Sequence, residues 1–193
     1  MKIIYGGSFN PPTIAHKSIY NFLDSKLDFS EFIYLPVSKK YGKDYLESNE
    51  DRYNMLSLIT KDLPKAKVSS DEFKDDAYLG TYHYLKGQGD DTYFLMGSDN
   101  LLTIKSWINY KLLIKECKFI VIERGNEDME SFINNDKELS KYRDNFILFD
   151  DFDCDASSSK YRNEKDESII PMEVLDYIKE HKLYGGMKWR MDL

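Results

Sequence analysis

The residues best placed to do chemistry lie at the start of the chain, in the run Gly-Gly-Ser-Phe-Asn-Pro-Pro-Thr-Ile-Ala-His from Gly6 to His16. The apolar stretch Lys2–Tyr5 precedes this run, so the pattern predicts a strand, a glycine-rich turn stiffened by prolines, and a helix that begins at about Thr13. Such a turn directs backbone N–H groups, the positive end of a helix dipole and the His16 imidazole toward one place. The sequence therefore predicts a binding site for a phosphate chain.

A second run of small hydroxyl residues lies near the other end of the chain. It reads Ser157-Ser158-Ser159-Lys160-Tyr161-Arg162. Hydroxyl side chains at a helix start, with a cation one turn further on, favour a second anion site. The same serines would serve equally well as an ordinary helix cap, so the run alone leaves both interpretations open.

A third pattern places polar residues after a buried strand. The apolar run Thr92–Met96 ends at Gly97, Asp99 follows at the start of an expected helix, and Trp107 comes eight residues later. By themselves, Asp99 fits a helix cap and Trp107 fits core packing. The strand end nevertheless brings Gly97–Asp99 to the edge at which parallel sheets bind their ligands.

Composition bounds the class of protein. The chain has 193 residues, of which 41% are hydrophobic and 15% aromatic, and these values predict one globular domain with a sizeable core. The formal net charge of −7 argues against a general nucleic-acid-binding surface. A protein of this charge that binds polyanions must gather its cations locally. Two clusters do so: Lys39, Lys40 and Lys43, and Lys160, Arg162 and Lys165.

The two cysteines, Cys117 and Cys154, lie far apart and match no metal-binding spacing, so free thiols in a reducing cytosol are expected. No apolar run approaches the roughly 18 residues of a membrane span. The chain opens directly on a strand and a motif, which leaves no room for a signal peptide. We expect a cytoplasmic protein that binds neither nucleic acid nor a membrane.

Short β-rich runs alternate with longer amphipathic runs. This alternation predicts an α/β fold: a doubly wound, Rossmann-like parallel sheet with helices on both faces and a helical segment at the C-terminus. The expected strands are Lys2–Tyr5, Phe32–Val37, Lys67–Ser69, Thr92–Met96, Lys118–Glu123 and Asn145–Phe149. The expected helices are Ile14–Lys26, Asn49–Lys61, Tyr78–Lys86, Asn100–Lys115 (with a break near Trp107), Met129–Tyr142, Ser158–Glu164 and Met172–His181. We expect one domain over residues 1–184 and a tail over residues 185–193.

These motifs resemble those of the nucleotidyltransferase superfamily. The first run resembles its G-x-F-x-P-x-[HT]-x-G-H signature, matched by Gly7, Phe9, Pro11, Thr13 and His16, with Ala15 where a glycine is usual. The serine run resembles its I-S-S-T-x-I-R motif, and the stretch from Gly97 to Trp107 is similar to G-x-D-x-L…W of bacterial nicotinate-nucleotide adenylyltransferases. Further similar segments are Arg52 with Met55, Leu79–Leu85, Val121–Gly125 and Ile170–Tyr184, so the resemblance spans residues 2–184.

The resemblance implies adenylyl transfer from ATP to nicotinate mononucleotide, with Mg²⁺ carried by ATP and no metal bound by the protein itself. The implied catalytic residues are His16, Arg162 and Thr13. The implied nucleotide-binding residues are Gly7, Ser8, Phe9, Asn10, Gly97, Asp99, Ser157 and Ser158. The implied residues for the second substrate are Lys39, Thr81, Tyr82, Trp107 and Arg124.

Several alternatives stay open on the sequence. The acceptor could be nicotinamide mononucleotide or phosphopantetheine, and a regulator that binds nucleotides without chemistry would carry many of the same motifs. The oligomeric state, a homo-oligomer included, is open. So is the choice among Lys39, Lys40 and Lys43 as the lysine that meets phosphate.

Overall fold

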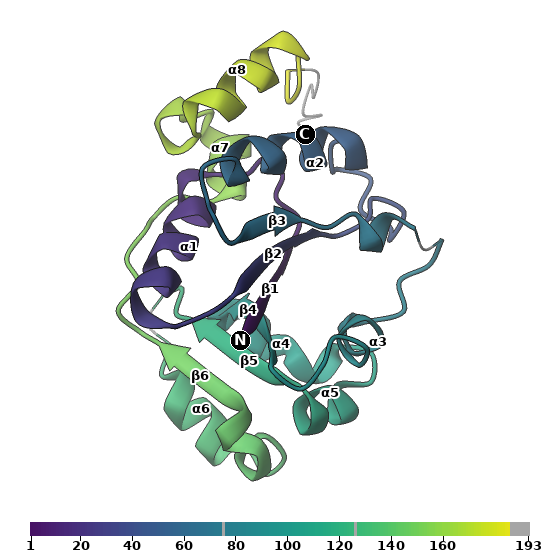
Figure 1. Cartoon of the computed structure of the whole chain (residues 1–193), viewed down its shortest axis with the longest axis vertical. Coiled ribbons are helices and arrows are strands. Elements are labelled where there is room, and N and C mark those ends of the chain that lie inside the picture. Colours follow the sequence, from purple (N-terminus) through teal and green to yellow (C-terminus); the bar gives the residue numbers. More distant parts are fainter. Residues whose placement is uncertain (75, 126, 186–193) are drawn as a thin grey trace, which may run out of the picture.

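The computed structural model describes residues 1–74, 76–125 and 127–185. Six parallel strands form one sheet in the order β3-β2-β1-β4-β5-β6 (Figure 1). The strands are β1 (Lys2–Gly7), β2 (Glu31–Pro36), β3 (Ala66–Val68), β4 (Thr92–Gly97), β5 (Lys118–Ile122) and β6 (Phe146–Phe149). This order confirms the doubly wound, Rossmann-like sheet. The chain adds strands on one side of β1 as far as β3 and on the other side from β4 onward, so the strand order switches between β1 and β4, which is where such sheets bind ligands.

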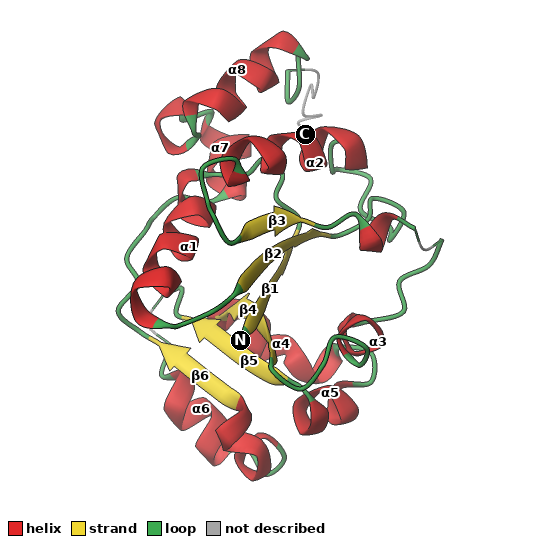
Figure 2. Ribbon diagram, in the orientation of Figure 1, coloured by secondary structure: helices red, strands yellow, loops and turns green. Residues whose placement is uncertain are grey.

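Helices cover both faces of the sheet, as expected (Figure 2). Side chains of α1, α2, α7 and α8 pack on one face, and those of α3, α4, α5 and α6 pack on the other. The helices are α1 (Ile14–Lys26), α2 (Asn49–Thr60), α3 (Thr81–Leu85), α4 (Ser98–Thr103), α5 (Tyr110–Glu116), α6 (Met129–Asn135), α7 (Ser158–Glu164) and α8 (Met172–Glu180). Short 3₁₀ helices span Asp71–Phe73, Ile104–Ser106, Leu139–Asn145 and Glu167–Ile169.

The alternation of side chains along β1 shows how one strand serves two cores. Ile3 and Tyr5 point into the core beneath α1, whereas Ile4 points into the core on the opposite face. All three are buried, because successive residues of a strand project to opposite faces and both faces are covered. A central strand of this kind is a rigid base for the loop that follows it.

Two expected helices are shorter or interrupted. The helix expected over Tyr78–Lys86 begins only at Thr81, because Gly80 before it has a φ of +90°. The helix expected over Asn100–Lys115 is divided into α4 and α5, which confirms the break expected near Trp107. Trp107 is extended, and Asn109 lies in the left-handed region at a φ of +58°. These two backbone conformations end a helix wherever they occur.

The helix expected over Met129–Tyr142 also ends early. The carboxylate of Asp136 accepts hydrogen bonds from the backbone N–H groups of Glu138 and Leu139, which replaces the helical pattern by a local turn. The chain then continues as a 3₁₀ helix into β6.

Of the tail expected at residues 185–193, only Gly185 belongs to the described residues. Across the part of the chain that the structure describes, no helix is long and apolar enough to cross a bilayer.

Candidate active site

The loop between β1 and α1, residues 8–13, holds His16 in a defined tautomer. The backbone N–H of Thr13 donates to Nδ1 of His16 at 2.8 Å, and the Thr13 hydroxyl lies 3.0 Å from the same nitrogen. Because a backbone N–H can only donate, Nδ1 is the acceptor and the ring proton is on Nε2. Burial, together with the charge of Arg124, lowers the pKa of His16 to about 3. The imidazole is therefore neutral and offers an Nε2–H donor.

Aromatic side chains fix the plane of this imidazole. Phe9 meets the His16 ring edge-on at 5.1 Å, and the ring of Tyr5 lies 6.0 Å away. From β2, the hydroxyl of Tyr34 donates to the backbone carbonyl of His16 at 2.8 Å. The donor is thus preorganised by two aromatic contacts and one hydrogen bond to the backbone of His16.

The start of α7 closes the other side of the loop. Ser157 caps α7 by accepting from the backbone N–H of Lys160, and the Ser158 hydroxyl donates to the carbonyl of Pro11 at 2.7 Å. Nη1 of Arg162 donates to the carbonyl of Asn10 at 2.6 Å. The serine run is therefore a helix cap and also a tie to the β1–α1 loop, although the two segments are distant in sequence.

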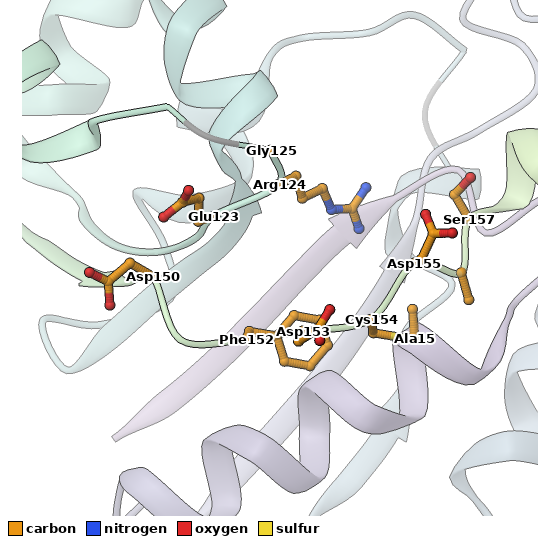
Figure 3. Close-up of a pocket in the computed structure, with 11 residues that line it drawn as sticks. Ala15, Glu123, Arg124, Gly125, Asp150, Phe152, Asp153, Cys154, Asp155 and Ser157 are labelled. Carbon is orange, nitrogen blue, oxygen red and sulfur yellow. The ribbon is translucent and has the colours of Figure 1, made fainter.

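Arg124 follows β5 and reaches across the carboxyl end of β4. A Cβ on Gly97 would lie 3.0 Å from Cδ of Arg124 and closer still to the Asp99 carboxylate, so a larger residue here would displace these two side chains from their present positions. Nη2 of Arg124 lies 3.4 Å from the hydroxyl of Tyr5. Figure 3 shows the guanidinium projecting across a cavity toward the segment that carries Ser157.

Three adjoining cavities form one trough along the carboxyl edge of the sheet. The central cavity is lined by residues from the β1–α1 loop, β4, β5 and α7, among them Gly7, Ser8, Phe9, His16, Gly97, Asp99, Arg124, Ser157, Ser158 and Arg162. A second, aromatic cavity shares Gly6, Gly7, Ser8, Met96 and Asn100 with it. A third, acidic cavity shares Arg124, Ala156 and Ser157 with it (Figure 3). The trough can hold an elongated ligand whose middle lies beside His16.

The aromatic cavity contains some of the residues expected for a second substrate. Thr81 and Trp107 line it together with Tyr78, Tyr84 and Phe94. Trp107 stands edge-on to Phe94, with ring centroids 6.1 Å apart. An apolar ring entering this cavity would meet aromatic walls.

The remaining expected residues lie elsewhere. Thr13 and Asn10 are fully buried behind the trough. In the described structure Lys39 lines none of the three cavities, whereas Lys43 lines the aromatic one. The phenol of Tyr82 points to another cavity and donates to Glu116 at 2.6 Å.

Some residues of the site carry no recognisable signal in the sequence. Tyr5 reads as an ordinary strand residue, yet its ring lies beside His16 and its hydroxyl beside Arg124. Tyr45 lines the central cavity from a segment without a recognised motif, and Asn100 lines it from a variable position of the Gly97–Trp107 motif. Tertiary packing, not a local sequence pattern, places such residues at the trough.

Within the described residues, the trough provides anion donors but no metal-binding cluster. Among the described residues, the ion pairs do not include Arg124 or Arg162, and no three histidine, cysteine or acidic side chains are grouped as metal ligands. Two guanidinium groups without carboxylate partners therefore face the central cavity, which suits a polyphosphate.

Comparison with known proteins agrees with this geometry. Residues 4–164 match the cytidylyltransferase-like family. A probable nicotinate-nucleotide adenylyltransferase from Acholeplasma laidlawii is 34% identical, over 97% of this chain and 100% of the relative. A second, from Clostridium acetobutylicum, is 31% identical over 95% and 98%.

Solved structures show the same relationship. The Plasmodium falciparum nicotinic acid mononucleotide adenylyltransferase complexed with NaAD superposes with a TM-score of 0.76 at 26% identity, covering 95% of this chain and 97% of that one. Sequence and fold thus agree over nearly the whole length. The chain belongs to the cytidylyltransferase-like family and, within it, to the nicotinate-nucleotide adenylyltransferases.

Proposed function

We propose that this chain transfers the adenylyl group of ATP to nicotinate mononucleotide, giving deamido-NAD and pyrophosphate. The observation that carries the proposal is the row of three adjoining cavities, with the His16 donor in the central one. Two mononucleotides joined through their phosphates have this shape, with a base at each end and charge at the centre. The aromatic cavity would take the pyridine, the central cavity the phosphates, and the acidic cavity the adenosine.

The reaction is an in-line displacement at the α-phosphorus of ATP. An oxygen of the mononucleotide phosphate forms a bond to this phosphorus, and the bond to the bridging oxygen of the β-phosphate breaks as pyrophosphate leaves. Such a reaction needs positioning and charge stabilisation more than covalent participation by the protein. ATP enters as its Mg²⁺ complex, which is the substrate.

In this scheme the Nε2–H of His16 donates to an α-phosphate oxygen as negative charge builds there. Its neutral state is suitable, because the group acts as a donor and takes up no proton. Arg162 and Arg124 stabilise the phosphates of ATP from opposite sides of the central cavity. Lys43, in the aromatic cavity beside Gly7 and Ser8, is placed to meet the phosphate of the acceptor.

The choice of acid over amide follows from donors at the pyridine end. Backbone N–H groups at Thr81 and Tyr82 would satisfy a carboxylate, whereas they cannot satisfy the NH₂ group of an amide. Trp107 would contact the pyridine ring. We place the reaction in the cytoplasm, since Cys117 and Cys154 are both free thiols and suit a reducing compartment.

The test is pyrophosphate release from Mg-ATP with nicotinate mononucleotide, nicotinamide mononucleotide or phosphopantetheine as acceptor. Nicotinate mononucleotide should give the highest kcat/KM. The matched variant is His16→Asn, because an asparagine oxygen can still accept from Thr13 while the Nε2–H donor is lost. Its kcat should fall by about 10²–10³-fold. Release that is faster with another acceptor would contradict the substrate assignment, and full activity of the variant would contradict the role of His16.

A further inference from the structure

Tyr184, which follows α8, enters the active-site loop from the far end of the chain. Its hydroxyl donates to Oδ1 of Asn10 at 3.0 Å, across 174 positions of sequence. The side chain is buried, with 7% of its surface exposed, and its ring packs edge-on against Tyr161 of α7 at 5.8 Å. Burial raises the pKa of the Tyr184 hydroxyl, so the group remains a donor.

The backbone of Tyr184 is held by two more segments. Its N–H donates to Oε1 of Glu47 at 3.1 Å, and its carbonyl accepts from Nζ of Lys165 at 3.0 Å. Its φ of +56° is in the left-handed region, which a bulky residue adopts only where its surroundings hold it there. Three separate hydrogen bonds thus determine where the hydroxyl lies.

Asn10 connects this tyrosine to the central cavity. Its side chain is fully buried, and Oδ1 also accepts from the backbone N–H of Glu47 at 3.0 Å. Its backbone carbonyl accepts from Nη1 of Arg162 at 2.6 Å. Tyr184 therefore fixes the residue whose carbonyl orients the Arg162 guanidinium.

We propose that Tyr184 is a positioning residue for adenylyl transfer, acting through Asn10 to set the place of Arg162 in the central cavity. The inference rests on the function proposed above, because it assigns Arg162 to the phosphates of ATP. The effect is carried by the hydroxyl, since a phenylalanine would keep the ring and its packing against Tyr161. Loss of one neutral hydrogen bond predicts a change of about fivefold.

The test compares Tyr184→Phe with wild type in kcat/KM for ATP and in calorimetric affinity for a non-hydrolysable ATP analogue. Both should fall about fivefold, while KM for the mononucleotide stays unchanged. The control is Tyr20→Phe, because Tyr20 is also a buried tyrosine with a hydrogen-bonded hydroxyl. This hydroxyl accepts from the backbone N–H of Lys65, just before β3, at the edge of the sheet opposite the trough. The control should keep wild-type ATP parameters.

A second pair of measurements separates positioning from a general loosening of the fold. In an Arg162→Ala background, Tyr184→Phe should no longer change ATP affinity, because the group it positions is gone. An equal loss in both backgrounds, or unchanged ATP parameters in the single variant, would overturn the inference. If Tyr184→Phe does not fold, Lys165→Met is tested in its place. It removes the exposed ammonium group that donates to the Tyr184 carbonyl, and the same ATP measurements are made.

The inference and the proposed function fail in different ways. Wild-type protein that releases no pyrophosphate with any acceptor would refute the proposed function. The affinity for the ATP analogue would still decide the role of Tyr184, because that measurement needs no turnover.

Discussion

The burial of neutral His16 predicts how the stability of this protein depends on pH. The folded protein holds the pKa of His16 at about 3 because the ring is removed from water and lies near Arg124, whereas an exposed histidine in the unfolded chain titrates near 6.5. Below pH 6.5 the unfolded chain therefore binds a proton that the folded protein does not. Stability must fall as the pH decreases from about 6.5 toward 3.

The size of the effect follows from the difference between the two values. Each pH unit below the unfolded pKa costs about 1.36 kcal/mol until the folded pKa is reached. At pH 5 the loss attributable to His16 is thus about 2 kcal/mol. A variant without a titrating group at this position should not show that part of the decline.

His16→Asn is the suitable comparison, because its side-chain oxygen can still accept from the backbone N–H of Thr13 at the start of α1. Urea denaturation of both proteins at pH 7, 6 and 5 gives the two stability curves, and every other titrating group cancels in their difference. Wild type should lose about 2 kcal/mol more than the variant between pH 7 and 5. Parallel curves would show that the imidazole is solvated and protonates freely, and would refute the burial argument.

Three further predictions concern the walls of the trough and its support. Trp107→Ala should raise KM for the mononucleotide about tenfold and leave KM for ATP unchanged in steady-state kinetics; an equal rise in both would make Trp107 a core residue only. Arg52→Met should lower the free energy of unfolding by about 3 kcal/mol or more, measured by denaturation, and a loss below about 1 kcal/mol would contradict the assigned contacts. Maleimide should modify half-buried Cys154 before buried Cys117, because burial raises the pKa of the Cys117 thiol to about 11. ATP should slow the reaction of Cys154, and the reverse order of modification would exclude Cys154 from the trough.

The sequence is most informative where local chemistry determines structure. The β1–α1 loop was predictable because glycines, prolines and a capping threonine each restrict the backbone nearby. The parallel sheet was predictable because the periodicity alternates between strand and helix. The break near Trp107 was also predicted, but the backbone that makes it was not, because it depends on Asn109 adopting a positive φ, a conformation that asparagine tolerates but does not require.

The parts of the site that sequence could not predict are contacts between distant segments. Nothing near Tyr184 indicates that its hydroxyl meets Asn10, because the contact requires α8 to lie beside the carboxyl end of the sheet. The choice among the three loop lysines is similar. Lys40 pairs with Asp76 at 2.7 Å, whereas Lys43 lines the aromatic cavity, and the spacing of the lysines does not distinguish them.

The arginines illustrate how structure divides one residue type into different roles. Arg52 is fully buried and donates to the Asn49 side chain and to three backbone carbonyls, those of Ser8, Val37 and Glu47. It therefore joins the β1–α1 loop to the chain after β2, and it has little hydrogen-bonding capacity left for a ligand. A guanidinium has five N–H donors. Within the described structure Arg162 uses two of them, and Arg124 makes a single long contact to Tyr5. The unused donors are therefore concentrated at the central cavity, where the charge of a polyphosphate would require them.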